Sequence, residues 1–302
     1  MPQADAQKRS FAVAGHEIVA PSLEGGLYVV ATPIGNLGDI TIRALGVLAG
    51  ADIICCEDTR VTRKLLDHYV VATPLTPYHE HNAAAARPKI LERLAAGDAI
   101  ALVSDAGTPL ISDPGYKLVR EASHAGHLVT AVPGASAVLA ALSLGALPTD
   151  RFFFEGFLPP KQAARQKRIA ELARIPATLV LFESGPRLAD ALADLAAGFG
   201  EREAAVCREL TKLHEEIRRS DLVSLTQHYA QGAETRGEMV IVVAPPQEQE
   251  ADDIDALLRN ALARVSVKDA VGEVALATGR SKREVYQRAL ELSDESGDGK
   301  AR

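Results

Sequence analysis

The feature that most constrains the fold is a regular alternation between short apolar runs and segments with helical character. Apolar runs of strand length occupy residues 27–31, 52–56, 99–104 and 128–132, and helical patterns such as 40–49 and 61–69 separate them. This alternation is typical of βαβ units, which build a mainly parallel sheet. We therefore expect an α/β domain over residues 27–146.

A second series of strands follows a proline turn at residues 147–150. Its apolar runs are 152–154, 178–182, 204–207 and 239–243. Between them, one helix face is marked by the i, i+3, i+4, i+7 spacing of Leu188, Ala191, Leu192 and Leu195. The pattern predicts a second α/β domain over residues 149–246, closed by a polar linker that starts at Pro245 and Pro246.

The two ends of the chain lack the strand–helix alternation of the middle. Residues 252–295 contain three short helical patterns, with Gly279 expected to end the second and Ser281 and Glu284 expected to form a capping box on the third. We interpret this part as a small module resembling a helix-turn-helix. Residues 1–26 are mixed polar and charged, lack a secretory signal, and are expected to form a flexible tail.

Composition narrows the class of protein. The chain has 302 residues, of which 47% are hydrophobic, and a net charge of −7, so any binding of nucleic acid must rest on local basic patches. Cys55, Cys56 and Cys207 have no metal-ligand spacing, so we expect reduced thiols in a cytosolic protein and no metal site. The uncharged stretch 128–149 is broken by a Pro-Gly pair, which favours a strand, a turn and a core helix over a membrane span.

One polar loop is expected to bind a small ligand, and a second one could do so. The run ALVSDAGTPLISDPG, residues 101–115, is a buried strand that opens into a Gly- and Pro-rich loop. Strand ends of this kind carry the ligands of α/β sheets. The loop TPIGNLGDIT, residues 32–41, follows the first strand, but it lacks the dinucleotide and P-loop fingerprints and could be an ordinary βα turn.

Two further clusters contain side chains that could bind a substrate or take part in catalysis. Asp58 and Arg60 follow a strand, where they could bind or react with a substrate, although Asp58 could instead cap the next helix. His79 and Asn82 lie in the segment YHEHN, whose i, i+2 histidine spacing does not match the usual zinc-ligand patterns. A site for ribose or phosphate would also use such a cluster, and Asn82 as a helix cap is the alternative.

Local excesses of basic residues suggest that the acidic chain binds a polyanion. One excess lies in residues 151–168 and consists of Arg151, Lys161, Arg165, Lys167 and Arg168. The other lies in the C-terminal module and consists of Arg264, Lys268, Arg280, Lys282, Arg283 and Arg288. Solvated helix faces are the competing explanation for both.

The motifs occur in an order that resembles one family. They are TPIGNLGDIT, CEDTR, YHEHN, SDAGTPLISDPG, PGASA, LFES, RELTKLHEE and RGEMVIVV. Together they resemble the small-subunit (16S) ribosomal RNA cytidine 2′-O-methyltransferases, which have the tetrapyrrole-methylase fold, over residues 27–292. Where the family usually has Ser-Pro-His-Arg, this chain has Ser184-Gly185-Pro186-Arg187. The histidine is absent, so no role of that histidine carries over.

The resemblance implies a cofactor, a substrate and an assembly. The implied cofactor is S-adenosylmethionine, held in a cleft between the two α/β domains of a cytoplasmic homodimer. The implied substrate is small-subunit ribosomal RNA, either free or in the assembled 30S subunit. The family's cofactor-binding positions correspond here to Pro33, Ser104, Asp105, Gly107, Thr108, Pro109, Ser136, Phe182, Gly237 and Glu238. Loop amides and an acid such as Asp105 suit the methionine end of this cofactor, and apolar side chains suit its adenine.

For the transfer itself, we hypothesise that Asp58 is the base and that Arg60 orients the ribose or a phosphate, with His79 or Asn82 completing that wall. Two rival functions remain. A methylase of a tetrapyrrole precursor would share the fold and cofactor, but usually has a GxGPG-type first loop and no basic helical appendage. A non-catalytic helix-turn-helix protein that senses a ligand is the rival from another class.

Overall fold

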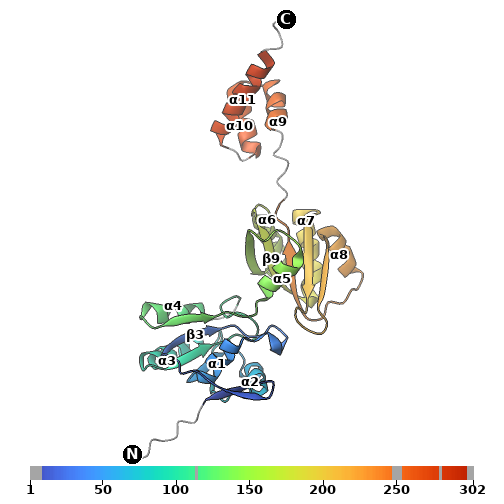
Figure 1. Cartoon of the computed structure of the whole chain (residues 1–302). Coiled ribbons are helices and arrows are strands. Elements are labelled where there is room, and N and C mark those ends of the chain that lie inside the picture. Colours follow the sequence, from blue (N-terminus) through green and yellow to red (C-terminus); the bar gives the residue numbers. More distant parts are fainter. Residues whose placement is uncertain (1–8, 113–114, 247–253, 279–280, 298–302) are drawn as a thin grey trace, which may run out of the picture. The chain divides into compact units, whose positions relative to one another are not determined.

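The computed structural model describes residues 9–112, 115–246, 254–278 and 281–297 (Figure 1). The chain divides into two compact units, with the boundary between Ala244 and Pro245. The predicted linker begins at this boundary, and residues 247–253 lie outside the described residues.

A five-stranded, all-parallel sheet with the order β5-β4-β6-β3-β7 forms the first half of the larger unit. Its strands are β3 (Gly26–Val30), β4 (Ile53–Cys56), β5 (Leu75–Pro77), β6 (Ala99–Leu102) and β7 (Val129–Val132). Its helices are α1 (Ile42–Gly50), α2 (Thr59–His68), α3 (Ala83–Ala95) and α4 (Tyr116–His124), with a 3₁₀ turn at Leu37–Asp39.

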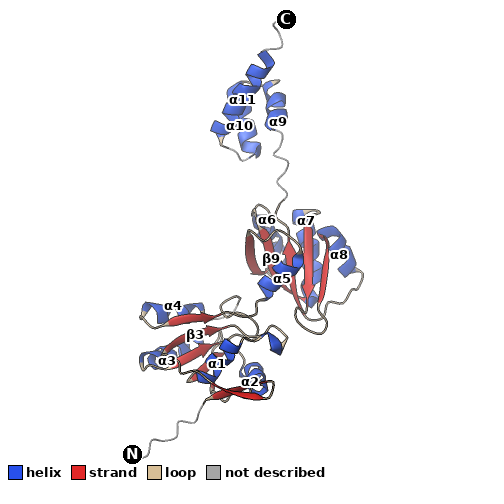
Figure 2. Ribbon diagram, viewed as in Figure 1, coloured by secondary structure: helices blue, strands red, loops and turns tan. Residues whose placement is uncertain are grey.

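Helices cover both faces of this sheet (Figure 2), and successive side chains of each strand point to opposite helical layers. Tyr28 and Val30 belong to the buried cluster that contains residues of α1 and α2. Leu27 and Ile100 belong to the cluster that contains residues of α3 and α4. Because both faces are covered, the strands read as continuous apolar runs, which is why the sequence showed them clearly.

The strand order creates a crevice between the ends of β4 and β6. The chain leaves β4 toward β5 at one edge of the sheet, whereas it leaves β6 toward β7 at the other edge. Loops that diverge from neighbouring parallel strands leave a gap at the carboxyl ends, which is where α/β sheets bind ligands. The loops that begin near Asp58 and Ser104 meet at this position.

The second sheet has the order β11-β10-β12-β9-β8, and only its β8–β9 pair is parallel. Its strands are β8 (Phe152–Phe157), β9 (Thr178–Ser184), β10 (Glu203–Arg208), β11 (Glu216–Asp221) and β12 (Glu238–Val243). One face packs on α6 (Gln162–Leu172), α7 (Gly185–Phe199) and α8 (Leu222–Ala230). The other packs on α5 (Ala137–Gly145) and on Ile34 from the loop after β3.

The stretch 128–149 forms β7, a turn and α5, as the sequence indicated. None of the helices in the described ranges combines the length and the hydropathy that crossing a lipid bilayer requires. All three cysteines are buried and free, and burial raises the pKa of Cys55 to about 12.

The expectation of a flexible tail over residues 1–26 is wrong for part of that range. Strands β1 (Ser10–Val13) and β2 (His16–Val19) form an antiparallel hairpin. Phe11 is buried in the core beside α1, and the N–H of Ala12 donates to the carbonyl of Tyr69 at 2.8 Å. Each strand of the hairpin has only four residues, SFAV and HEIV, and β2 is exposed along its whole length. Residues 1–8 lie outside the described residues.

The second unit contains three helices, α9 (Ile254–Leu262), α10 (Val267–Thr278) and α11 (Lys282–Gly297), around one apolar cluster. The predicted capping box is confirmed. The N–H of Ser281 donates to the Glu284 carboxylate at 3.2 Å, and the N–H of Glu284 donates to the Ser281 hydroxyl at 3.3 Å. Gly279, the predicted end of α10, lies outside the described residues.

Candidate active site

A hollow of about 300 Å³ opens at the carboxyl ends of β3 and β6, and we call it the polar hollow because half of its lining residues carry charged or hydroxyl side chains. It is bounded by the loops after these strands, by one face of α2, and by two residues from the second sheet's half. Its lining residues are Thr32, Pro33, Ile34, Gly35, Leu37, Val61, Thr62, Lys64, Leu65, Ser104, Asp105, Ala106, Lys212 and Glu238.

An apolar hollow of about 200 Å³ adjoins the polar one. The two share Ile34, Ala106 and Glu238. The rest of its lining is mostly apolar and comes from both halves: Ile111, Ser112, Ala137, Phe157, Phe182, Leu210, Met239 and Val240. An apolar chamber that continues into a polar one can hold a ligand with an aromatic end and a charged end.

Asp105 supplies a carboxyl group to the polar hollow. Its Oδ1 accepts a hydrogen bond of 3.0 Å from the backbone N–H of Asp58, so the side chain is anchored across the crevice between β4 and β6. Burial raises the pKa of Asp105, although this hydrogen bond acts in the opposite direction. A positioned carboxylate with a raised pKa is a better proton acceptor than an ordinary aspartate.

Asp58 and Arg60 lie beside this crevice but line neither hollow. The Asp58 carboxylate accepts the N–H of Arg60 at 2.8 Å as the cap of α2, and it also pairs with the Arg60 guanidinium. The hydrogen bonds from Arg60 lower the pKa of Asp58 to about 2. A carboxylate of this kind is a weak base, so the geometry favours the capping alternative.

His79 and Asn82 shape the turn before α3 and do not line either hollow. Asn82 Oδ1 accepts the N–H of His79 at 2.9 Å, and its Nδ2 donates to the carbonyl of Pro77 at 2.9 Å. The Asn82 side chain therefore bonds backward rather than capping the helix. Within the described ranges, no three His, Cys, Asp or Glu side chains are grouped to hold a metal ion.

Some of the expected cofactor-binding residues line one of the two hollows, and a second group lines neither. Pro33, Ser104, Asp105 and Glu238 line the polar hollow, and Phe182 and Glu238 line the apolar one. Gly107, Thr108, Pro109, Ser136 and Gly237 line neither hollow.

Three of this second group join loops or cap a helix. The backbone N–H of Thr32 donates to the carbonyl of Gly107 at 2.9 Å, and the Thr108 hydroxyl donates to that of Ala135 at 3.2 Å. Ser136 is the N-cap of α5.

Sequence reasoning missed two lysines in the polar hollow. Lys64 lies on α2, and Lys212 lies in the loop after β10. The Lys212 ammonium donates to Glu209 at 2.7 Å and to Glu238 at 3.0 Å. The motif RELTK contains this lysine, but nothing in the sequence shows that its loop reaches the first half of the unit.

The basic patch expected in residues 151–168 is neutralised at two of its five basic residues. Arg165 is buried and paired with Asp194 at 2.6 Å, and Arg168 pairs with Glu155 and Glu171. The expectation of a polyanion-binding patch is therefore wrong for these two arginines, because Asp194 on α7, Glu155 on β8 and Glu171 on α6 itself neutralise them. In the second unit, Arg264 and Arg288 are also paired with carboxylates.

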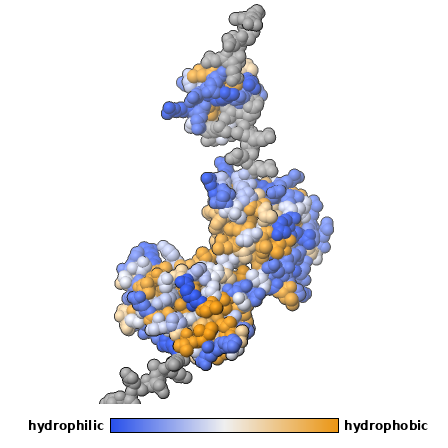
Figure 3. Space-filling model, viewed as in Figure 1, coloured by the Kyte–Doolittle hydropathy of each residue, from blue (hydrophilic) through white to orange (hydrophobic). Residues whose placement is uncertain are grey.

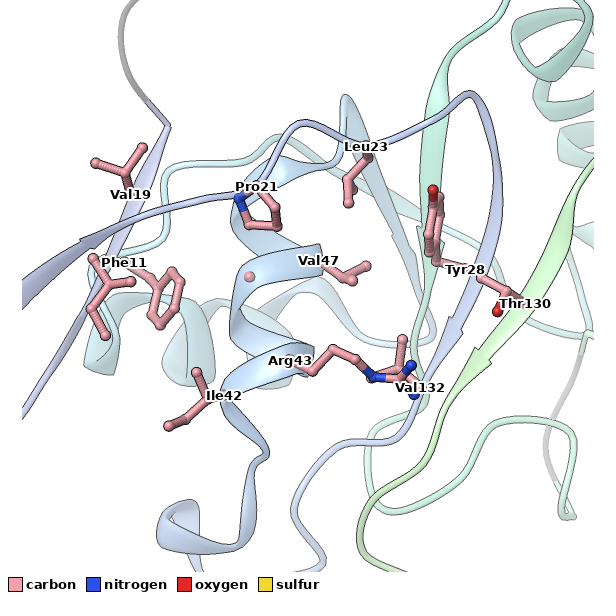
Figure 4. Close-up of a pocket in the computed structure, with 12 residues that line it drawn as sticks. Phe11, Val19, Pro21, Leu23, Tyr28, Ile42, Arg43, Val47, Thr130 and Val132 are labelled. Carbon is pink, nitrogen blue, oxygen red and sulfur yellow. The ribbon is translucent and has the colours of Figure 1, made fainter.

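A third hollow, of about 460 Å³, lies between the N-terminal hairpin, α1 and the edge of the first sheet (Figure 4). Its lining is mostly apolar, and the guanidinium of Arg43 already donates to the carbonyl of Ala131 at 3.0 Å. Hydrophobic residues also gather on the surface over α1 (Figure 3). Without converging reactive groups among its lining residues, this hollow offers no chemistry comparable to that of the polar one.

Comparison with known proteins identifies the class. Residues 26–226 match the family described as tetrapyrrole (corrin/porphyrin) methylases, and residues 248–293 match the RsmI C-terminal HTH domain. The structure is similar to that of a uroporphyrin-III C-methyltransferase from Thermus thermophilus solved with S-adenyl homocysteine. Its TM-score is 0.50 at 19% identity over 73% of this chain and 97% of that chain. The fold is that of the tetrapyrrole methylases, a class of methyltransferases.

Curated relatives narrow this class. The chain is 51% identical over 286 residues to the ribosomal RNA small subunit methyltransferase I of Mesorhizobium japonicum, covering 94% of this chain and 97% of the relative. It is 50% identical over 279 residues to the protein of the same name from Erythrobacter litoralis, covering 92% and 99%. The chain belongs to the ribosomal RNA small subunit methyltransferase I family.

Proposed function

We propose that this methyltransferase transfers a methyl group from S-adenosylmethionine to the ribose 2′-hydroxyl of a cytidine in small-subunit ribosomal RNA. The observation that carries the proposal is the pair of adjoining hollows, one apolar and one polar, which share Ile34, Ala106 and Glu238. The names of the curated relatives support ribosomal RNA as the substrate.

The lining of the two hollows fits this cofactor. Phe157 and Phe182, whose ring centroids are 5.7 Å apart, offer the apolar hollow a wall for an adenine. Glu238, which lines both hollows, offers a carboxylate to the positively charged methionine end of the cofactor. When bound, the cofactor supplies an electrophilic methyl group, whose carbon–sulfur bond breaks as the acceptor oxygen attacks.

The remaining positions of the family's cofactor site act by fixing the loops. Gly107, Thr108 and Ser136 tie the loops after β3, β6 and β7 to one another or to α5. Pro109 belongs to the loop after β6 and restricts its backbone, whereas Gly237 lies just before β12 and has a φ of +104°, a conformation that favours glycine. Loops held in this way present their backbone groups to a ligand without further ordering.

The acceptor ribose occupies the polar hollow, and Asp105 takes its proton. Asp105 replaces Asp58 in this role because Asp105 lines the hollow and its pKa is raised, whereas the pKa of Asp58 is about 2. Asp58 and Arg60 hold the Asp105 side chain and the start of α2 in position. His79 and Asn82 complete the neighbouring wall, where the RNA backbone runs.

The partners follow from the family and from the second unit. One hollow of the helical module is lined by Lys282, Arg283 and the exposed ring of Tyr286, which suit phosphates and an unstacked base. Its lining also includes Lys268 and the acidic residues Asp269 and Glu273. We propose that this module binds the ribosomal RNA. On the resemblance of the motifs, the enzyme acts in the cytoplasm as a homodimer.

The test offers the enzyme two kinds of acceptor with methyl-labelled S-adenosylmethionine. The first is small-subunit ribosomal RNA, either naked or in the assembled subunit, and the second is a tetrapyrrole precursor. We expect label in the RNA and none in the tetrapyrrole. Label in the tetrapyrrole alone, or tight RNA binding without any transfer, would refute the proposed substrate.

A further inference from the structure

Lys212 is held in the polar hollow by two carboxylates. Its ammonium donates to Glu209 Oε1 at 2.7 Å and to Glu238 Oε2 at 3.0 Å. Burial lowers the pKa of this ammonium, but the two hydrogen bonds outweigh burial and raise the pKa. Lys212 is therefore a fixed cation at neutral pH and cannot act as a base.

The surrounding backbone is built to fix this side chain. Glu209 and Thr211 adopt left-handed backbone conformations with φ of +50° and +67°, which non-glycine residues rarely adopt. Glu209 Oε1 also accepts the N–H of Glu238 at 2.9 Å. Unfavourable conformations of this kind persist where the surroundings impose them, and they cluster at functional sites.

The stem of Lys212 crosses to the loop after β3. A Cβ built on Gly35 would lie 2.3 Å from Cγ and 2.8 Å from Cε of Lys212, so only glycine leaves room for the stem. The lysine therefore extends from the loop after β10 over the loop that carries Pro33. An ammonium has three N–H donors. The contacts to Glu209 and Glu238 use two of them, so one remains for a ligand in the hollow.

We propose that Lys212 is a catalytic residue that donates this third hydrogen bond to the attacking oxygen of the acceptor hydroxyl. This inference rests on the proposed function. As the oxygen–carbon bond forms, the hydroxyl proton passes to Asp105 while Lys212 keeps its three protons. The positive charge stabilises the negative charge that develops on the oxygen, and a fixed donor does this without reorganising.

A phosphate contact would use the same chemistry at another atom of the RNA. The geometry favours the hydroxyl, because Lys212 shares its hollow with the Asp105 carboxyl and with Glu238, which also lines the apolar hollow. Lys64 enters the same hollow from α2, outside the carboxylate pair that holds Lys212. We assign the phosphate contact to Lys64.

The test is single-turnover methylation of small-subunit ribosomal RNA by the full chain. Lys212→Met is expected to lower the rate constant of methyl transfer about 10²–10³-fold. This is the usual cost of removing one fixed hydrogen-bond donor from a developing oxyanion. The RNA concentration at half-maximal rate and the affinity for S-adenosylhomocysteine should change little. Lys64→Met should instead raise that RNA concentration, by a larger factor at low salt than at high salt. The exposed Lys117 on α4 provides a control, since Lys117→Met should change neither quantity.

Chemical rescue distinguishes a rate lost with the positive charge of Lys212 from a rate lost through misfolding. The three native cysteines are fully buried, so in Lys212→Cys the new thiol is the accessible one. Alkylation with 2-bromoethylamine restores an ammonium at nearly the length of lysine and should restore most of the rate. Alkylation with iodoacetamide gives a neutral amide and should not.

The outcomes distinguish this inference from the function on which it rests. If the wild-type enzyme transfers no methyl group to RNA, both fail. If the wild-type enzyme is active and Lys212→Met retains its rate, the catalytic role of Lys212 alone is overturned. A loss confined to RNA affinity, or equal rescue by the two alkylating agents, also overturns it.

Discussion

The backbone N–H of Asp58 and the carboxylate of Asp105 are joined by a hydrogen bond of 3.0 Å. This contact links the loops after β4 and β6, whose chains diverge toward opposite edges of the sheet. It holds Asp105 at the polar hollow, while the carboxylate of Asp58 is occupied by Arg60. The two acids thus have different tasks, although they are neighbours in space.

The first prediction separates these two acids. Asp105→Asn should lower the single-turnover rate of methylation about 10²–10⁴-fold, the usual contribution of a proton acceptor. Asp58→Asn should lower it much less, because the backbone N–H that holds Asp105 remains. Equal losses in the two variants would contradict the assignment of the base to Asp105.

The pH dependence of the rate gives a second prediction. Asp105 must be ionised to accept a proton, and burial raises its pKa, with Asp58 adding to the increase and Arg60 opposing it. The rate should therefore fall as the pH is lowered through a value above the usual aspartate pKa of 3.8. With Asp58 as the base, the decrease would occur only near its pKa of about 2. A pH–rate profile on folded enzyme decides between them.

The buried pair of Arg165 and Asp194 gives a prediction about stability. Burial raises the pKa of Asp194, but hydrogen bonds from Gln166, Arg165 and Gln162 lower it more. Arg165→Met would leave this carboxylate buried without its cation and should reduce the free energy of unfolding by about 3–5 kcal/mol at neutral pH.

The sign of the pH effect follows from the lowered pKa. The stabilisation by this pair is present above the pKa of an unfolded aspartate and is lost as the pH falls through the lower pKa of the folded state. Denaturant unfolding of the wild type and Arg165→Met at neutral and acidic pH measures both effects. An Arg165→Met variant of unchanged stability but weakened RNA binding would show that the arginine belongs to an RNA-binding patch after all.

Gly185, one of the positions at which the chain departs from its family's usual sequence, lies in a close backbone contact that can be tested. A Cβ at this position would lie 1.6 Å from the carbonyl oxygen of Thr235, which approaches the start of α7. Gly185→Ala should therefore displace that loop and lower the free energy of unfolding by about 1–3 kcal/mol or more. Gly272→Ala is a control, because its Cβ would meet nothing within 4 Å. Equal stability of Gly185→Ala and the wild type would contradict this close approach.

The helical module can be tested through salt dependence. The paired variant Lys282→Met with Arg283→Met should weaken RNA binding and reduce the slope of log affinity against log salt by about 0.7 for each lost contact to a phosphate of single-stranded RNA. Binding isotherms over a range of salt concentrations measure this slope. An unchanged slope would remove the module from the RNA-binding surface.

Local patterns predicted most of the regular structure, because it depends on local interactions. The buried strands read as apolar runs, and the capping box needs only Ser281 and Glu284, three residues apart. The hairpin at residues 10–19 was missed because its apolar runs are very short, and β11 was missed because it is an edge strand of mostly polar residues.

The site was less predictable, because it depends on contacts between residues that are distant in sequence. The motifs located the loops with Pro33, Ser104 and Asp105. Counting charges could not reveal that Asp194 neutralises Arg165, 29 residues earlier. Nor could it reveal that Lys212 crosses over Gly35, since this depends on the packing of one half of the unit on the other.

The measurement that tests the central claim most directly is alkaline hydrolysis of RNA that the wild-type enzyme has methylated with labelled S-adenosylmethionine. A methylated 2′-oxygen cannot attack the adjacent phosphodiester, so that bond survives alkali. The account predicts that the label appears in an alkali-stable dinucleotide whose 5′ nucleoside is 2′-O-methylcytidine. Label released in mononucleotides, with the methyl group on a base, would contradict it.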